Sequence, residues 1–286
     1  MSENSALTCE VCPHHCKIPE GKAGKCRARG TRDGKNVPLN YGIISSIALD
    51  PIEKKPLRRF YPGSSILSVG SFGCTLNGPF CQIREISMSD GSEYLRSGEE
   101  RFLAPEVLAD MADKLRNRGN IGVAFTYNEP TVCFEYILDT APLLREKDLK
   151  TVLVTNGCVE EKIAARLIPW VDALNIDLKS FDPAVYRKTL GGDLETVKRF
   201  VEMASADCHV ELTTLIVPGL NDSEAEMRAL SGWIASLPNG EEIPLHITRF
   251  FPRYRMTDRA ATELRTVLRL TAIAKETLKY VYPGNI

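Results

Sequence analysis

The stretch that decides the fold reads IGVAFTYNEP and spans residues 121–130. A short apolar run is followed there at once by polar residues that include Asn128 and Glu129. Continuous apolar runs of this length are typical of parallel strands that helices cover on both faces. The same order recurs along the chain and predicts six strands, at 66–69, 121–125, 151–154, 173–176, 209–217 and 244–250.

Helical patterns separate these strands. Apolar residues repeat at helical spacing from Val107 to Leu115, and Pro105 suits the first turn. Five further helices are predicted at 131–144, 160–168, 194–203, 222–237 and 260–278. Strand–helix units in series predict an α/β fold with a parallel sheet and right-handed crossovers. The sheet either closes as a partial barrel or lies open and doubly wound, and in both cases active groups gather at the carboxyl ends of the strands.

Polar segments do follow the predicted strands. They lie at 74–81, 127–130, 155–157, 177–179, 218–222 and 249–253. Taken singly, each segment also fits a turn or a helix cap, since Asn-Gly at 156–157 is a common turn pair. Their coincidence at successive strand ends predicts one shared site.

The loop after the first strand reads GCTLNGPFCQ, residues 73–82. Iron–sulfur clusters are held by cysteine thiolates at short, fixed spacings. The spacing C-x3-C-x2-C would place three thiolates around one cluster, and Cys74 and Cys81 occupy its outer positions. Gly78 occupies the middle position and offers no ligand. Asn77, a water molecule and Cys133 are the candidates for the missing donor.

A second cysteine group lies near the N-terminus. It consists of Cys9, Cys12, Cys16 and Cys26. Four soft ligands at such spacing suit tetrahedral zinc or an auxiliary iron–sulfur cluster, and His14 or His15 could replace one thiolate. The chain is therefore predicted to divide into a cysteine-rich metal-binding or cap segment, 1–62, with a short strand over 37–47, and a barrel, 63–286.

Composition excludes several classes of function. The 286 residues carry a formal net charge of −1, which argues against a general nucleic-acid surface. The basic run at 53–59 is interpreted as a solvated loop. No apolar run approaches the ~18 residues of a membrane span, and the N-terminus lacks the features of a signal peptide. We therefore expect no membrane partner and a cytoplasmic location, where nine cysteines indicate metal or redox chemistry.

These motifs together resemble radical S-adenosylmethionine (SAM) proteins, and more narrowly the AmmeMemoRadiSam-system radical SAM family, which is related to the activating enzymes of glycyl-radical enzymes. The matching segments are 9–16, 21–29, 50–57, 126–131, 154–157, 176–180, 212–223, 244–258 and 280–282. The resemblance implies a partial (β/α)6 barrel that binds a [4Fe-4S] cluster and SAM. It also implies reductive cleavage of SAM to a 5′-deoxyadenosyl radical, which abstracts a hydrogen atom from the substrate.

The resemblance assigns roles at the strand ends. Asn128 and Glu129 match the position that holds the SAM amino group, where a carboxylate suits an ammonium. Thr155 and Asn156 match a strand end beside the nucleoside or methionine part. Asp177 and Lys179 match a pair beside SAM, in which Lys179 balances the SAM carboxylate; a local ion pair is the alternative.

Arg249 and the cysteine loop are two further parts of the predicted site. Arg249, at the end of the last predicted strand, is a candidate for binding an anionic substrate or cofactor group. The cysteine loop departs from the family pattern, because Thr75 and Ile83 stand in place of asparagines and Gly78 in place of the middle cysteine.

Three hypotheses follow. The first is a radical SAM enzyme whose cluster has an unusual set of ligands, or whose chain carries a substitution at position 78. It acts on a small molecule or a protein and takes electrons from a reductant such as flavodoxin or ferredoxin. The second is a catalytically impaired relative that binds SAM or a partner without radical chemistry. The third is a non-radical enzyme that uses the N-terminal metal.

Overall fold

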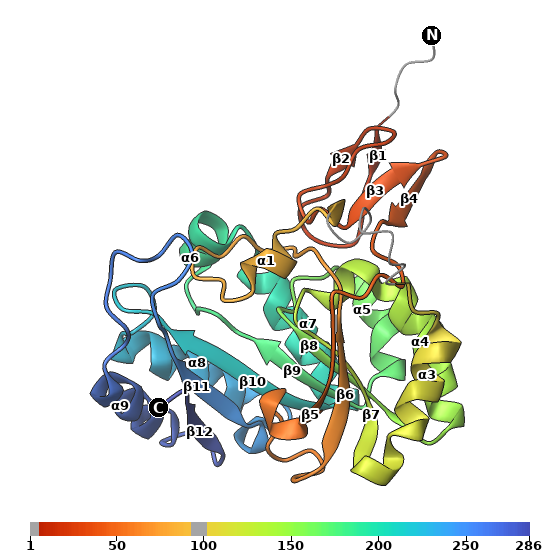
Figure 1. The fold of residues 1–286 in the computed structure, drawn as a ribbon. Helices are drawn as coiled ribbons and strands as arrows, with labels where there is room; N and C mark the ends of the chain where they lie inside the picture. The colour runs from red at the N-terminus through yellow and green to blue at the C-terminus, as the bar shows by residue number, and fades with distance from the viewer. Residues whose placement is uncertain (1–5, 93–101) are drawn as a thin grey trace.

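The computed structural model describes residues 6–92 and 102–286 and contains one large sheet of eight strands (Figure 1). The strands are β5 (Ser46–Pro51), β6 (Ser65–Gly70), β7 (Asn120–Phe125), β8 (Lys150–Thr155), β9 (Ala173–Asp177), β10 (His209–Ile216), β11 (Leu245–Arg249) and β12 (Val281–Gly284). Their order in the sheet follows the chain from β5 to β12. Strands β6 to β12 run parallel, and β5 pairs antiparallel with β6. The six predicted parallel strands are confirmed, and the α/β fold is a partial barrel.

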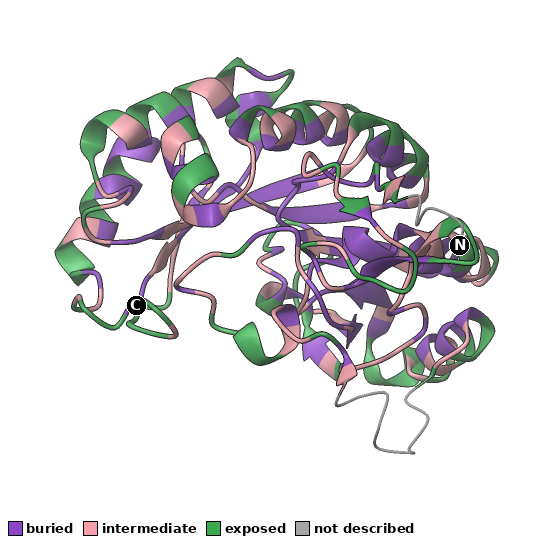
Figure 2. Ribbon diagram, turned by 90° about the horizontal axis from the view of Figure 1, so that it is seen from above, coloured by how far each residue is buried: buried purple, intermediate pink, exposed green. Residues whose placement is uncertain are grey.

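Helices connect the strands and cover the outer face of the sheet. They are α3 (Pro105–Lys114), α4 (Phe134–Glu146), α5 (Glu161–Leu167), α7 (Leu194–Asp207), α8 (Glu224–Ser236) and α9 (Leu264–Ala274), with the short helices α1 (Arg84–Ser87) and α6 (Pro183–Val185). Figure 2 shows the buried strands of the sheet and the exposed outer faces of the surrounding helices. Among the helices of the described residues, none combines the length and the apolar character that crossing a bilayer requires.

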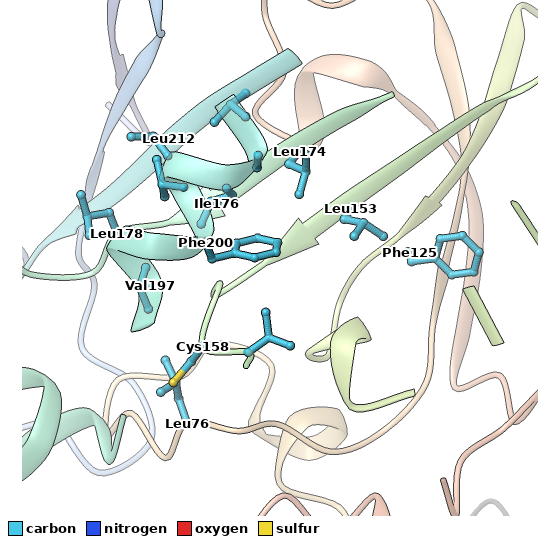
Figure 3. Packing of buried hydrophobic residues seen from close by; sticks show 14 of the residues in the cluster. Leu76, Phe125, Leu153, Cys158, Leu174, Ile176, Leu178, Val197, Phe200 and Leu212 are labelled. Carbon is cyan, nitrogen blue, oxygen red and sulfur yellow. The ribbon is translucent and has the colours of Figure 1, made fainter. Parts of the chain in front are cut away.

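The main hydrophobic core lies between the sheet and these helices. It takes side chains from β7, β8, β9 and β10, and Ile176 of β9 lies beside Phe200 of α7 (Figure 3). Leu76, in the cysteine loop, belongs to the same core, as does Cys158. Both lie against Gly192, where a Cβ would approach Leu76 Cδ2 to 2.4 Å. The cysteine loop is therefore anchored to the barrel by apolar packing as well as by its backbone.

The N-terminal segment forms two small antiparallel sheets beside the barrel. One pairs β1 (Leu7–Thr8) with β2 (Lys17–Ile18), and the other pairs β3 (Arg29–Arg32) with β4 (Lys35–Pro38). The predicted strand over 37–47 is wrong, because Gly42 has a left-handed φ of 68° that breaks the chain between β4 and β5. Strand β5 belongs to the main sheet, although it precedes the predicted boundary at residue 62. The division into two domains stays a prediction.

A loop closes the barrel at the N-terminal ends of its strands. The backbone N–H groups of Arg58 and Arg59 donate to the carboxylate of Glu211, at 3.0 and 2.7 Å. His246 Nε2 lies 2.6 Å from the same buried carboxylate. The Arg59 guanidinium also lies 3.6 Å from the ring centroid of Tyr280, just before β12. The loop thereby bridges the two ends of the open sheet.

Candidate functional site

A cavity of about 410 Å³ lies inside the barrel, towards the carboxyl ends of the strands. Residues predicted from the sequence line it together: Cys74, Cys81, Asn128, Glu129, Thr155, Asn156, Asp177 and Lys179. They come from the segments that follow β6, β7, β8 and β9, so parallel strands bring residues more than a hundred positions apart to one place. Their ligand-binding roles stay predictions, but their convergence is a property of the fold.

Glu129 is fully buried and ties two strand ends together. Its Oε1 accepts hydrogen bonds from Thr131 Oγ1 and Thr155 Oγ1, both at 2.7 Å. Its Oε2 accepts from the backbone N–H of Asn156 at 2.8 Å. Burial raises the pKa of Glu129, while these hydrogen bonds oppose that rise. The carboxylate is thus fixed in orientation at the wall of the cavity, where a charged hydrogen-bond acceptor suits an ammonium group.

Asn128 has a different part in the site. Its Oδ1 accepts from the backbone N–H of Ser71 at 2.9 Å, and its Nδ2 donates to the carbonyl of Phe72 at 3.1 Å. Both partners belong to the turn that leads from β6 into the cysteine loop. Asn128 therefore positions the chain just before Cys74, and its amide is occupied by backbone groups.

Asn156 links the end of β8 to the cysteine loop. Its Nδ2 donates to Thr75 Oγ1 at 3.0 Å and lies 3.5 Å from Cys74 Sγ. Its Oδ1 accepts from the backbone N–H of Cys158 at 2.9 Å. The side chain is thus held on both sides and directs a hydrogen-bond donor at the sulfur of Cys74.

The two cysteines of the loop face the same cavity. Burial, reinforced by the charge of Glu129, raises the pKa of the Cys74 thiol to about 12. Cys81 Sγ lies 3.1 Å from Ser87 Oγ at the end of α1. Lys179 is close enough to the loop for its positive charge to favour the thiolate of Cys74, and thiolates at Cys74 and Cys81 would in turn raise the pKa of Lys179.

Gly78 lies at the wall of the cavity, between the two cysteines in sequence. A Cβ built there would have Leu190 Cδ2, at 3.5 Å, as its nearest neighbour, which is an ordinary van der Waals distance. The position therefore has room for a side chain, and its backbone does not require glycine. Neither of the two residues suggested as a substitute donor lines this cavity. Asn77 lines a second cavity, and the buried Cys133 lines a third one together with Tyr136.

Asp177 and Lys179 form an ion pair at the end of β9, with 2.8 Å between Asp177 Oδ2 and Lys179 Nζ. Burial alone would lower the pKa of Lys179, but the charge of Asp177 and its hydrogen bond to Lys179, together with the two loop cysteines, raise this pKa above its ordinary value. Lys179 is therefore an ammonium at neutral pH, and it stands in the cavity beside the cysteines. This placement is what the balancing of a SAM carboxylate would need.

Arg249 is not part of this group. Its Nε donates to the carbonyl of Thr262 at 2.6 Å, and its guanidinium lies 5.0 Å from the ring centroid of Phe251. The residue of β11 that lines the cavity is Thr248 instead. The expectation that Arg249 meets an anionic group at the shared site is not supported, because successive strand residues point to opposite faces.

The N-terminal cysteines lie close to the cysteine loop. Cys9, Cys12 and Cys26 are buried, and Cys16 is half-buried. The backbone N–H of Cys74 donates to the carbonyl of Cys26 at 3.2 Å, and His14 Nε2 lies 2.8 Å from the carbonyl oxygen of Thr75. Within residues 6–92 and 102–286, no three His, Cys, Asp or Glu side chains are arranged to hold a metal ion. Zinc or an auxiliary cluster at these cysteines stays a prediction.

The interpretation of residues 53–59 as a solvated loop missed one feature. Lys55 is only 3% exposed, and with Lys54 it lines the cavity from below. Lys55 Nζ lies 2.9 Å from Asp50 Oδ2. Asp50 precedes Lys54 by four residues and Lys55 by five. This spacing is the sequence feature that could have indicated a buried ion pair.

Comparison with known proteins identifies the family. Residues 68–230, more than half of the chain, match the Radical SAM superfamily. The chain belongs to the radical SAM superfamily. The uncharacterized protein MJ0808 of Methanocaldococcus jannaschii is 35% identical over 99% of this chain and 83% of its own length. The 7-carboxy-7-deazaguanine synthase of the same organism is 25% identical over 60% of this chain and 72% of its own length.

Solved radical SAM structures share the fold. The structure of TYW1 with a lysine-pyruvate adduct bound matches with a TM-score of 0.53 and 16% identity. The match covers 82% of this chain and 84% of the TYW1 chain. The structure of Streptococcus suis SuiB bound to S-adenosylmethionine matches with a TM-score of 0.55 and 12% identity. The match covers 77% of this chain and 52% of the SuiB chain. At these identities the likeness concerns the fold alone.

Superfamily membership implies a [4Fe-4S] cluster and SAM as cofactors, and the residues present meet this only in part. Cys74 and Cys81 supply two thiolates to one cavity, whereas Gly78 supplies none. The groups expected around SAM, at Glu129 and Lys179, are present and fixed. The site therefore suits SAM better than it suits a cluster held by three cysteines.

Proposed function

We propose that this protein is a radical SAM enzyme that binds SAM in the barrel cavity and abstracts a hydrogen atom from an organic substrate. The proposal rests on one observation: the superfamily match spans the strands whose ends converge on this cavity. A cluster held there would supply the electron that cleaves the SAM sulfonium. The proposal includes a substrate, which is either a small molecule or a protein. It also includes an electron donor of the flavodoxin or ferredoxin type.

The chain's own residues supply binding and orientation. Glu129 offers a fixed carboxylate to the SAM ammonium, and Lys179 offers an ammonium to the SAM carboxylate. Thr155 Oγ1 and the backbone N–H of Asn156 hold the Glu129 carboxylate by hydrogen bonds between the strand ends. Burial of the cavity wall strengthens each charged contact relative to the same contact in water.

A second candidate function is SAM binding without radical chemistry. The observation that favours it is Gly78, because two thiolates do not complete the three-cysteine arrangement. The protein would then act as a binding or regulatory subunit.

Anaerobic iron–sulfide reconstitution of the natural chain and of Gly78→Cys separates the two. Iron content, electron spin resonance after reduction, 5′-deoxyadenosine formation and SAM binding are measured for both, with Gly78→Ser as the control that adds a side chain without a thiol. Formation of 5′-deoxyadenosine by the natural chain supports the radical enzyme. Formation by Gly78→Cys alone, with SAM bound by both, supports the second candidate. Absence of SAM binding in every variant contradicts both.

A further inference from the structure

The cavity has a charged floor that the binding of SAM does not use. We define this floor as Lys54 and Lys55, which follow β5, together with Tyr127, which follows β7. All three line the cavity that Cys74 and Lys179 also line. Because β5 runs antiparallel to β6, its end and the two lysines lie at the opposite end of the barrel from the cysteine loop.

Three groups of the floor meet one carboxylate. Asp50 Oδ1 lies 3.2 Å from Lys54 Nζ, and Asp50 Oδ2 lies 2.9 Å from Lys55 Nζ. Tyr127 OH donates to Asp50 Oδ2 at 2.9 Å. Lys55 Nζ also lies 4.7 Å from the ring centroid of Tyr127. The lysines are therefore held in place by Asp50, with the aromatic ring beside one of them.

The charges of the floor do not balance. Two ammonium groups share one carboxylate, so one positive charge is left over at this end of the cavity. Elsewhere in the lining, Lys179 is paired with Asp177, and the Glu129 carboxylate accepts hydrogen bonds from Thr155 and Asn156. An ammonium has three N–H donors, and the hydrogen bond to Asp50 takes one from each lysine.

A pair with a purely structural role would need only one lysine, because Lys55 alone neutralises Asp50. Lys54, whose side chain is mostly exposed, brings a second cation to the same carboxylate and to the cavity. Lys55 is almost completely buried, and burial lowers its pKa in spite of its pairing with Asp50. The backbone of Tyr127 has a φ of 69°, a conformation that side chains other than glycine rarely adopt and that is found at functional sites.

We infer that Lys54 and Lys55 form a subsite for an anionic group of the substrate, a carboxylate or a phosphate. The inference rests on the proposed function, because it places the substrate between this floor and SAM at the cysteine loop. Lysines act as point charges without the fork geometry of arginine, so both anions meet the same chemistry here. The substrate class is an organic acid or a phosphate ester.

The test is isothermal titration of the full chain with inorganic phosphate and with acetate, each with and without SAM, beside a separate titration with SAM. Lys54→Gln changes a side chain that is 66% exposed, so folding is retained. Lys54→Gln/Lys55→Met removes both cations, and Lys147→Gln, which breaks the surface pair with Asp110, is the matched control. Probe affinity is expected to fall about tenfold in Lys54→Gln, since a hydrogen bond to a charged group contributes on this order.

The arms separate the outcomes. A probe affinity that falls in Lys54→Gln and in the double variant, with SAM affinity unchanged and the control like the natural chain, supports the subsite. Phosphate and acetate then show which anion is preferred. Failure of the natural chain to bind either probe while it binds SAM overturns the inference and leaves the proposed function standing. Loss of SAM affinity in Lys54→Gln also overturns it, because the lysines would then serve SAM itself. Absence of SAM binding in the natural chain contradicts the proposed function, whatever the probes do.

Discussion

Asn156 and Thr75 are joined through their side chains, with 3.0 Å between the amide nitrogen of Asn156 and the hydroxyl oxygen of Thr75. The backbone N–H of Asn156 donates at the same time to Glu129. One residue at the end of β8 therefore connects the segment after β7 with the cysteine loop after β6. The same amide nitrogen lies 3.5 Å from Cys74 Sγ, so this connection stands directly beside a cysteine that lines the cavity.

Asn156→Ala is expected to loosen the cysteine loop. The variant leaves the hydroxyl of Thr75 without its amide partner, and a lost hydrogen bond contributes about 1 kcal/mol. Because local opening then becomes easier, alkylation of Cys74 should be roughly fivefold faster than in the natural chain. The rate is followed by mass spectrometry that resolves Cys74 from Cys81. Asn77→Ala, which changes an exposed amide in the same loop, should alkylate at the natural rate. Equal rates in all three proteins would show that Asn156 does not hold the loop.

Lys179→Gln is expected to weaken SAM binding about tenfold, because it removes an ammonium that stands beside both loop cysteines. Lys179→Arg keeps the charge and should recover part of the affinity. Equilibrium dialysis with labelled SAM measures both variants. Lys198→Gln, which breaks an ion pair with Glu195 on the surface, serves as the control. Unchanged affinity in Lys179→Gln would mean that Asp177 and Lys179 form only a local ion pair.

The sequence predicted six strands of the barrel because short apolar and β-branched runs alternate with helical patterns, as expected of strands that helices cover. It did not predict β12, whose residues include Pro283 and Gly284 and which lies at an edge of the sheet. Proline is tolerated at an edge strand, where one side of the backbone has no partner. Strand β5 was missed for a related reason: its exposed edge position gives it no apolar run.

The strand ends predicted most of the cavity but not its floor. Residues after parallel strands converge because of topology, so Glu129 and Lys179 could be placed together from their positions in the sequence. Lys55 could not, since a basic run is usually solvated, and its burial follows only from the antiparallel pairing of β5 with β6. Arg249 shows the opposite case, because a strand-end position does not tell which face the side chain occupies.

The N-terminal cysteines are expected to bind metal and to influence the cysteine loop. Cys26 and His14 contact the backbone of residues 74 and 75, so a metal that fixes the N-terminal segment also fixes this loop. Anaerobically purified protein should contain zinc or iron that Cys12→Ser/Cys16→Ser loses. Elemental analysis distinguishes zinc from an iron–sulfur cluster, which also absorbs visible light. Cys208→Ser, between α7 and β10, is the control. An equal metal content in all three proteins would place the metal elsewhere.

Glu211 makes the stability of the barrel depend on pH. Burial alone would raise the pKa of Glu211, but hydrogen bonds from His209, His246 and the backbone of Arg58 and Arg59 lower it to about 2. The folded pKa thus lies below the unfolded value of 4.5, so the stabilisation is complete above pH 4.5 and is lost as the pH falls towards 2. Between these limits the natural chain should lose about 1.4 kcal/mol of unfolding free energy per pH unit relative to Glu211→Gln, which cannot titrate at this position.

Urea unfolding at several pH values between 7 and 3 measures this difference. Glu211→Gln should be less stable than the natural chain at pH 7, because Arg59 and His246 lose a charged acceptor inside the barrel. The two proteins should then approach each other in stability as the pH falls. Glu242→Gln, which removes a carboxylate paired with Lys279 at the surface, should follow the natural chain closely, since exposed pairs contribute little. Parallel stability curves for the natural chain and Glu211→Gln would show that the loop at 58–59 is not held by the charge of Glu211.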